Sequence, residues 1–63
     1  MILYQTKENN VINLDRITMI YRDPETNIYR VSFTNGMTYE MPEITEEDIE
    51  RFMQYNSFIN KIQ

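Results

Sequence analysis

The side chains best suited to chemistry in this sequence are carboxylates, and most of them fall in one stretch. Carboxylate groups can hold a cation, act as an acid–base pair, or attract a basic protein. A calcium loop needs alternating oxygen ligands and a central Gly, a spacing that this stretch lacks, so we predict no metal site. A docking patch and the solvated start of a helix, where negative charge is favourable, both remain open. The residues concerned are Glu40, Glu43, Glu46, Glu47, Asp48 and Glu50.

Other catalytic groups are missing from the composition. The chain has no Cys and no His, which removes thiolate and imidazole nucleophiles, bases and metal ligands. A phosphate-binding loop rich in Gly is absent, because Gly36 is the only Gly. A chain of 63 residues also has little room for a deep cleft that excludes water. We therefore expect a protein without enzymatic activity and without a cofactor.

The charge balance bears on the class of partner. Six Lys and Arg against ten Asp and Glu give a net charge of −4, which disfavours a phosphate-binding surface. Only a stripe of Arg16, Arg22 and Arg30 could contact DNA or RNA. No apolar run approaches the roughly 20 residues of a membrane-spanning helix, and no stretch resembles a signal peptide. We expect a cytoplasmic protein with a protein partner, with a nucleic-acid-mimicking or nucleic-acid-binding regulator as the alternative.

The elements that must position these groups begin with a hairpin over residues 29–41. A two-residue turn at Asn35 and Gly36 would mix apolar and polar side chains on both faces. A three-residue loop over residues 34–36, with Gly36 in a left-handed bulge, separates them instead. This register pairs Phe33 with Met37, Val31 with Tyr39, Tyr29 with Met41 and Arg30 with Glu40.

The preceding stretch predicts a second hairpin with a five-residue loop over residues 23–27, where Pro and Asn suit a turn. In this register Arg22 pairs with Ile28. The strand that precedes the loop then has one apolar face, which would carry Ile17, Met19 and Tyr21. An N-terminal strand over residues 2–6 is expected at an edge.

The C-terminal segment predicts a helix over residues 46–60. Thr45 is a suitable N-cap, and Asp48 stands at the third helical position as in a capping box. We therefore predict one α+β domain over residues 1–63, an antiparallel four-stranded β-meander with one C-terminal amphipathic helix. The predicted core consists of Ile17, Met19, Tyr29, Val31, Phe33, Tyr39, Ile49 and Phe52.

The predicted helix carries more apolar residues than one sheet can cover. One stripe suits the sheet, and a second is displaced from it by roughly a third of a turn. Either the helix bends near Asn56 to keep covering the core, or the second stripe is an interface. The interface would serve a protein partner, above all a homodimer in which two antiparallel helices meet at Phe58 and Ile62. The candidate partner-binding residues are Tyr55, Phe58, Ile59, Ile62, Glu46 and Glu47.

Residues 2–44 resemble the small flagellar FlbD-like proteins. The shared features are an opening strand, a bend at NLD with an Ile after it, and a strand ending in N-G before another strand. The segments concerned are ILYQT, VINLDRITMIYRDPETN and IYRVSFTNGMTYEMPE. A similar succession of an NLD bend, an Ile and a later N-G occurs in the sheet of LytTR DNA-binding domains, which this stretch also resembles. The resemblance implies no site residue, and the small acidic chain suggests a bacterial or phage regulatory or inhibitor protein.

Overall fold

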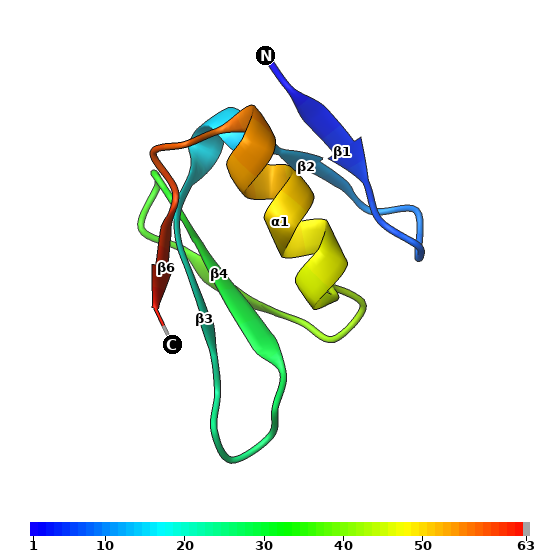
Figure 1. Cartoon of the computed structure of the whole chain (residues 1–63), viewed down its shortest axis with the longest axis vertical. Coiled ribbons are helices and arrows are strands. Elements are labelled where there is room, and N and C mark those ends of the chain that lie inside the picture. The colour runs from blue at the N-terminus through cyan, green and yellow to red at the C-terminus, as the bar shows by residue number, and fades with distance from the viewer. Residues whose placement is uncertain (63) are drawn as a thin grey trace.

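A computed structural model describes residues 1–62 as two sheets with one helix between them. The strands form a two-stranded sheet, β1-β2, and a four-stranded sheet in the order β5-β4-β3-β6. The helix lies between the β1-β2 hairpin and the larger sheet (Figure 1). In chain order the elements are β1 (Leu3–Gln5), β2 (Val11–Asn13), a short 3-10 turn (Leu14–Arg16), β3 (Ile17–Arg22), β4 (Tyr29–Phe33), β5 (Thr38–Met41), α1 (Glu46–Tyr55) and β6 (Asn60–Ile62).

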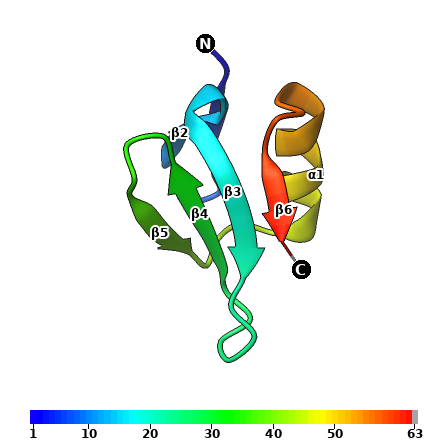
Figure 2. The same cartoon turned by 90° about the vertical axis from the view of Figure 1, so that its left-hand side faces the viewer.

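The α+β class is confirmed, but the larger sheet is not an antiparallel meander. After β5 the chain passes through α1 and returns at the opposite edge as β6, which pairs in parallel with β3. The first two strands do not join this sheet, because they pair only with each other within residues 1–62. Figure 2 looks onto the face of the larger sheet that α1 leaves uncovered.

The helix is shorter than predicted and ends where Asn56 leaves the helical conformation. Asn56 has φ −140° and ψ 97°. Its Nδ2 donates to the Leu14 carbonyl oxygen at 2.8 Å, and its Oδ1 accepts from the Phe58 amide at 3.0 Å. These bonds turn the chain back towards the sheet, so Ile59 enters the core, where it is 3% exposed. The helix therefore ends at Tyr55 rather than at Asn60.

The start of the helix and the hairpin between β4 and β5 are as predicted. Thr45 Oγ1 accepts from the Asp48 amide, and the Asp48 carboxylate accepts from the Thr45 amide, which completes the capping box. Gly36 has φ 85°, the left-handed conformation that the three-residue loop requires. The register also matches, with Val31 opposite Tyr39 and the remaining predicted pairs in phase.

The register predicted for the hairpin between β3 and β4 is wrong by one residue. Arg22 pairs with Tyr29, not with Ile28, and the Asp23 amide donates to the Ile28 carbonyl at 3.0 Å. An irregularity between Ile17 and Met19 restores the pairing of Ile17 with Phe33. Because successive strand residues face opposite sides, this shift turns Ile20 towards α1 and Met19 and Tyr21 towards the uncovered face.

The core differs from the prediction in the same way. Of the predicted members, Tyr39 is 45% exposed, and Met19 and Phe33 are only partly buried. Phe33 still packs against the core from its margin. Ile20 and Ile59 are buried instead, which follows from the shifted register of β3 and the early end of α1. The buried apolar residues are Ile12, Leu14, Ile17, Ile20, Tyr29, Val31, Ile44, Ile49, Phe52 and Ile59.

Candidate functional site

The predicted partner-binding residues do not form one surface. Glu46 and Glu47 open α1 and Tyr55 closes it, a separation of about 12–14 Å along the helix axis at 1.5 Å per residue. Ile59 is a core residue, so it has no exposed surface to offer a partner while the protein is folded. The acidic and apolar halves of the predicted site therefore lie at opposite ends of the helix.

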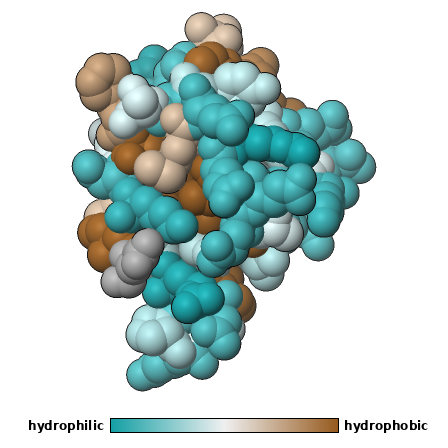
Figure 3. All heavy atoms as spheres, in the orientation of Figure 1, coloured by the Kyte–Doolittle hydropathy of each residue, from teal (hydrophilic) through white to brown (hydrophobic). Residues whose placement is uncertain are grey.

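The exposed apolar side chains at the C-terminal end of α1 remain as a candidate interface. Tyr55 is 58% exposed and Phe58 is 89% exposed. We call these two residues the C-terminal apolar patch. In the orientation of Figure 1, apolar side chains reach an otherwise mostly hydrophilic surface near the turn between α1 and β6 (Figure 3). The turn at Asn56 holds this aromatic pair at the surface.

The predicted packing of two helices through Phe58 and Ile62 is wrong, since neither residue belongs to α1. Phe58 lies in the turn that follows the helix. Ile62 lies on β6, where it pairs with Tyr21 on the uncovered face of the sheet and is 52% exposed. The two side chains therefore belong to different parts of the surface.

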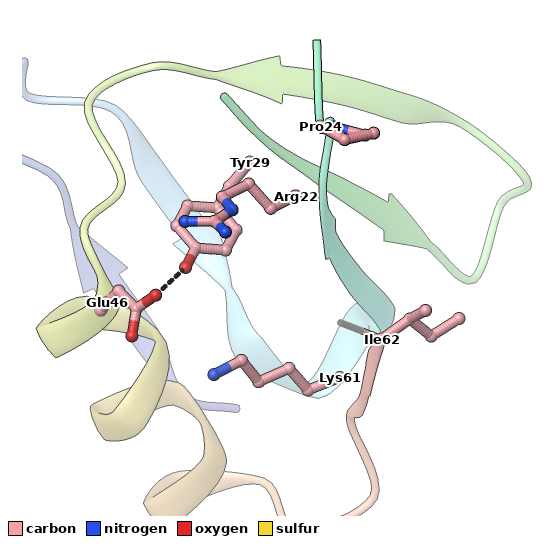
Figure 4. A pocket seen from close by; sticks show the side chains of 6 residues that line it. All are labelled: Arg22, Pro24, Tyr29, Glu46, Lys61 and Ile62. Atoms are coloured by element: carbon pink, nitrogen blue, oxygen red, sulfur yellow. Dashed lines mark hydrogen bonds between the residues drawn. The ribbon is translucent and has the colours of Figure 1, made fainter. Parts of the chain in front are cut away.

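A charged pocket of about 410 Å3 opens between the sheet and the start of α1. Arg22 ends β3, Tyr29 begins β4 opposite it, and Lys61 comes from β6. Figure 4 shows the Lys61 ammonium directed towards Glu46, which stands at the first position of α1. The complete lining is Arg22, Pro24, Tyr29, Glu46, Lys61 and Ile62.

The electrostatics of this charged pocket keep its carboxylate ionised and its phenol neutral. The Tyr29 hydroxyl donates to Glu46 Oε1 at 2.7 Å, and this bond lowers the pKa of Glu46, with the charges of Lys61 and Arg22 acting in the same direction. The same bond and burial raise the pKa of Tyr29 above its ordinary value of 10.0. At neutral pH Glu46 is thus an ionised acceptor and Tyr29 a neutral donor. Neither group is poised to exchange a proton.

Sequence reasoning missed this pocket because it depends on tertiary pairing. Tyr29 was expected to be only a core residue, and Lys61 lay beyond the end of a predicted helix. No local sequence pattern marks the pocket, because β6 reaches the edge of β3 only after the chain has crossed over from β5. A stripe of Arg16, Arg22 and Arg30 was left open as a possibility, but the register places Arg22 and Arg30 on opposite faces of the sheet.

A second carboxylate, Asp48, is 8% exposed and serves the fold. It accepts hydrogen bonds from the Tyr4 hydroxyl and from the Thr45 amide. Burial by itself would raise the pKa of Asp48, but these donors outweigh burial and hold the pKa below its ordinary value of 3.8. Asp48 is therefore an ionised anchor between β1 and α1 and not a general acid.

Residues 1–62 contain neither a cluster of metal-binding side chains nor a helix able to span a membrane. No group of three or more carboxylates is close enough together there to hold a metal ion. Nor does this part of the chain contain a helix with the length and apolar composition needed to cross a membrane.

Comparison with known proteins adds no relative. No family model, no curated protein and no solved structure matches the chain. The resemblance to FlbD-like proteins therefore stays a prediction from the sequence.

Proposed function

We propose that this chain is a non-enzymatic protein-binding module of the cytoplasm that assembles as a homodimer through the C-terminal apolar patch. One observation carries the proposal: Phe58 is 89% exposed, whereas its neighbour Ile59 is 3% exposed. The fold thus buries the Ile59 side chain and leaves the preceding Phe58 side chain exposed to water. Burying a Phe side chain contributes about 1.5–3 kcal/mol, which is available to association.

The size of the chain supports the same proposal. A domain of about 60 residues buries only about 60% of its unfolded surface and is marginally stable alone. A two-fold contact is the most common way for such a chain to gain buried area. Aromatic residues are enriched at the centre of interfaces, and Phe58 with Tyr55 supplies such a centre. A bacterial or phage regulatory role fits a module of this kind.

The acidic residues at the start of α1 have a lesser part in this proposal. The Glu47 carboxylate accepts from Arg51 at 3.0 Å, one helical turn later. The Glu46 carboxylate is engaged by Tyr29. Both groups therefore have partners within the chain, and the favourable interaction with the helix dipole accounts for their place.

Adjacent substitutions test the proposal. Phe58→Asp should convert a dimer into a monomer of 7.7 kDa while the far-UV circular dichroism stays unchanged, because the side chain makes no part of the core. Ile59→Asp is the matched comparison and should unfold the chain, because it buries an unpaired charge. Light scattering after size exclusion measures the mass. A wild-type protein that stays monomeric at high micromolar concentration would contradict the homodimer.

A further inference from the structure

Two strands present free edges to one groove. Within the described residues β2 pairs only with β1, and the outer edge of β5 has no partner. A groove of about 400 Å3 is lined by residues 10–13 and 39–41, together with Phe33 and Glu43. Successive side chains of a strand point to opposite faces. A groove that touches consecutive residues of both strands therefore borders their edges, and we call it the edge groove.

The hydrogen-bond phase of β5 shows which of its backbone groups face the edge groove. Bonded and non-bonded residues alternate along an antiparallel pair. The Phe33 amide donates to the Met37 carbonyl at 2.9 Å, so Met37, Tyr39 and Met41 stand in the phase that bonds to β4. The N–H and C=O of Glu40 then point away from β4. Glu40 is among the residues that line the groove, as this orientation requires.

The same reasoning applies to β2. The Leu14 amide donates to the Ile2 carbonyl at 2.8 Å, and the Thr6 amide donates to the Asn10 carbonyl at 2.8 Å. The residues of β2 in phase with these bonds face β1. The N–H and C=O of Val11 fall in the other phase and point towards the edge groove. Each wall of the groove thus offers one backbone N–H donor and one backbone C=O acceptor, from Val11 on β2 and from Glu40 on β5.

The side chains around the edge groove define the occupant. Val11 is 63% exposed and Tyr39 is 45% exposed, and the partly buried Phe33 and Met41 complete an apolar lining. The lining contains carboxylates at Glu40 and Glu43 but no Lys or Arg. Glu40 already accepts from Arg30 at 2.9 Å on the neighbouring strand, so Glu43 contributes most of the negative charge that a partner would meet. An occupant that covers this groove therefore needs apolar side chains, and its complementary charge is positive.

We propose that an extended segment of a partner protein, with apolar residues alternating with Lys or Arg, binds as an added strand between β2 and β5. The inserted strand would join the two sheets into one, in the order β1-β2-segment-β5-β4-β3-β6. This inference rests on the proposed function in that the partner is a protein, but it uses a surface separate from the C-terminal apolar patch.

A second copy of this chain fits the edge groove less well. Two β5 edges that pair antiparallel about Glu40 would place the two Glu40 carboxylates directly opposite each other, which destabilises a sheet, although less than for unpaired carboxylates because each accepts from its own Arg30 at 2.9 Å. A basic segment from another protein avoids this repulsion.

The probe for the test is the synthetic peptide KVKVKVK, capped at both ends and titrated into labelled Phe58→Asp protein. Amide chemical shifts should change saturably at Val11 and Glu40, and hydrogen exchange at both amides should slow. A peptide N-methylated at alternate residues loses the donors of one edge and should bind at least about tenfold more weakly. Glu43→Lys should weaken binding by about threefold to fivefold, as expected for an exposed ion pair.

Two substitutions at one position separate the backbone contact from the charge. Glu40→Gln keeps the N–H and should bind the peptide with an affinity within about fivefold of the parent protein. Glu40→Pro removes the same charge and also the N–H that faces the groove, a change that edge strands tolerate, and binding should be lost. If Glu40→Pro does not fold, the N-methylated peptide makes the same comparison from the ligand side.

Three results would overturn the inference. They are an absence of shifts at Val11 and Glu40 with several millimolar peptide, equal binding of the N-methylated peptide, and shifts at these amides that grow with protein concentration alone. The last result would assign the edge groove to a second copy. Because the Phe58→Asp background is used, failure of the homodimer, seen by light scattering, leaves this measurement unaffected.

Discussion

Replacing Tyr4 by Phe removes a hydroxyl on which a buried carboxylate depends, and it should destabilise the protein by about 2 kcal/mol. Asp48 is 8% exposed, and the Tyr4 hydroxyl is one of its few donors. The Phe ring would keep the edge-on contact with Phe52, whose ring centre lies 4.8 Å away at 83°. The substitution therefore isolates one hydrogen bond between β1 and α1.

The magnitude follows from the charge and burial of the acceptor. A hydrogen bond to a charged group contributes about 1.5–3 kcal/mol to stability, and partial burial of Tyr4 places this bond in the middle of that range. In a domain of this size 1 kcal/mol moves the melting temperature by about 4–8 °C. The expected decrease is therefore roughly 8–16 °C.

The effect should also depend on pH. The pKa of Asp48 is lowered in the folded state because donors such as Tyr4 and Thr45 outweigh burial, which would raise it. A lowered pKa adds stability that is complete above the unfolded value of 3.8 and is lost as pH falls through the folded value. Removing the Tyr4 hydroxyl raises the folded pKa. The difference between Tyr4→Phe and wild type should thus be largest at neutral pH and shrink in acid.

Urea denaturation followed by circular dichroism, at neutral and at acid pH, measures this difference. Tyr29→Phe is the matched control, because the Tyr29 hydroxyl donates at 2.7 Å to Glu46, an exposed residue. Its loss should cost clearly less than the loss of the Tyr4 hydroxyl, because water can replace the donor at the exposed Glu46 carboxylate. Equal losses for the two variants, or a Tyr4→Phe loss that does not change with pH, would refute the reasoning.

The other predictions concern the turns. Gly36→Ala should destabilise by about 1 kcal/mol or more, because φ is 85° while no atom lies within 4 Å of the added Cβ; an unchanged urea midpoint would contradict the turn assignment. Asn27→Ala should destabilise more than Asn27→Gly in the same assay, because φ at Asn27 is 61°. Asn56→Ala should cost about 1–2 kcal/mol in thermal unfolding, because it removes the bonds to Leu14 and Phe58, whereas the exposed Gln54→Ala should change little.

Local features of the sequence predicted the local structure. Gly36 determined the loop between β4 and β5, because the alternative turn would have mixed apolar and polar side chains on each face. Thr45 and Asp48 determined where α1 begins, because a capping box is a contact between near neighbours. In both cases the interacting groups lie within a few residues, so the sequence pattern contains the whole interaction.

The features that could not be predicted depend on distant partners. The periodicity of the C-terminal segment favoured a longer helix, but pairing of β6 with β3 and burial of Ile59 decide its conformation. The irregularity between Ile17 and Met19 shifts every later residue of β3, and no Gly or Pro marks it. The charged pocket was missed for the same reason, since Lys61 reaches it only on β6.

The edge groove was missed because it is made of backbone groups. Sequence patterns indicate side chains that could bind a partner, whereas the walls of this groove expose the backbone N–H and C=O of Val11 and Glu40. Any residue type can present such groups. Only the phase of pairing along β2 and β5 shows which ones remain free.

Pairing of β6 with β3 affects the order in which the protein folds. Asn56 bonds to Leu14 across 42 positions of the chain, whereas the hairpins of β3, β4 and β5 form between neighbouring segments. Closing long loops costs entropy before any contact is gained, which slows folding. The hairpins should therefore form early, and β6 should attach late. Because the three-residue β6 gains few contacts for the entropy that its attachment costs, it should detach first when the protein is heated or denatured. Its departure would uncover the edge of β3 while the rest of the sheet is still intact.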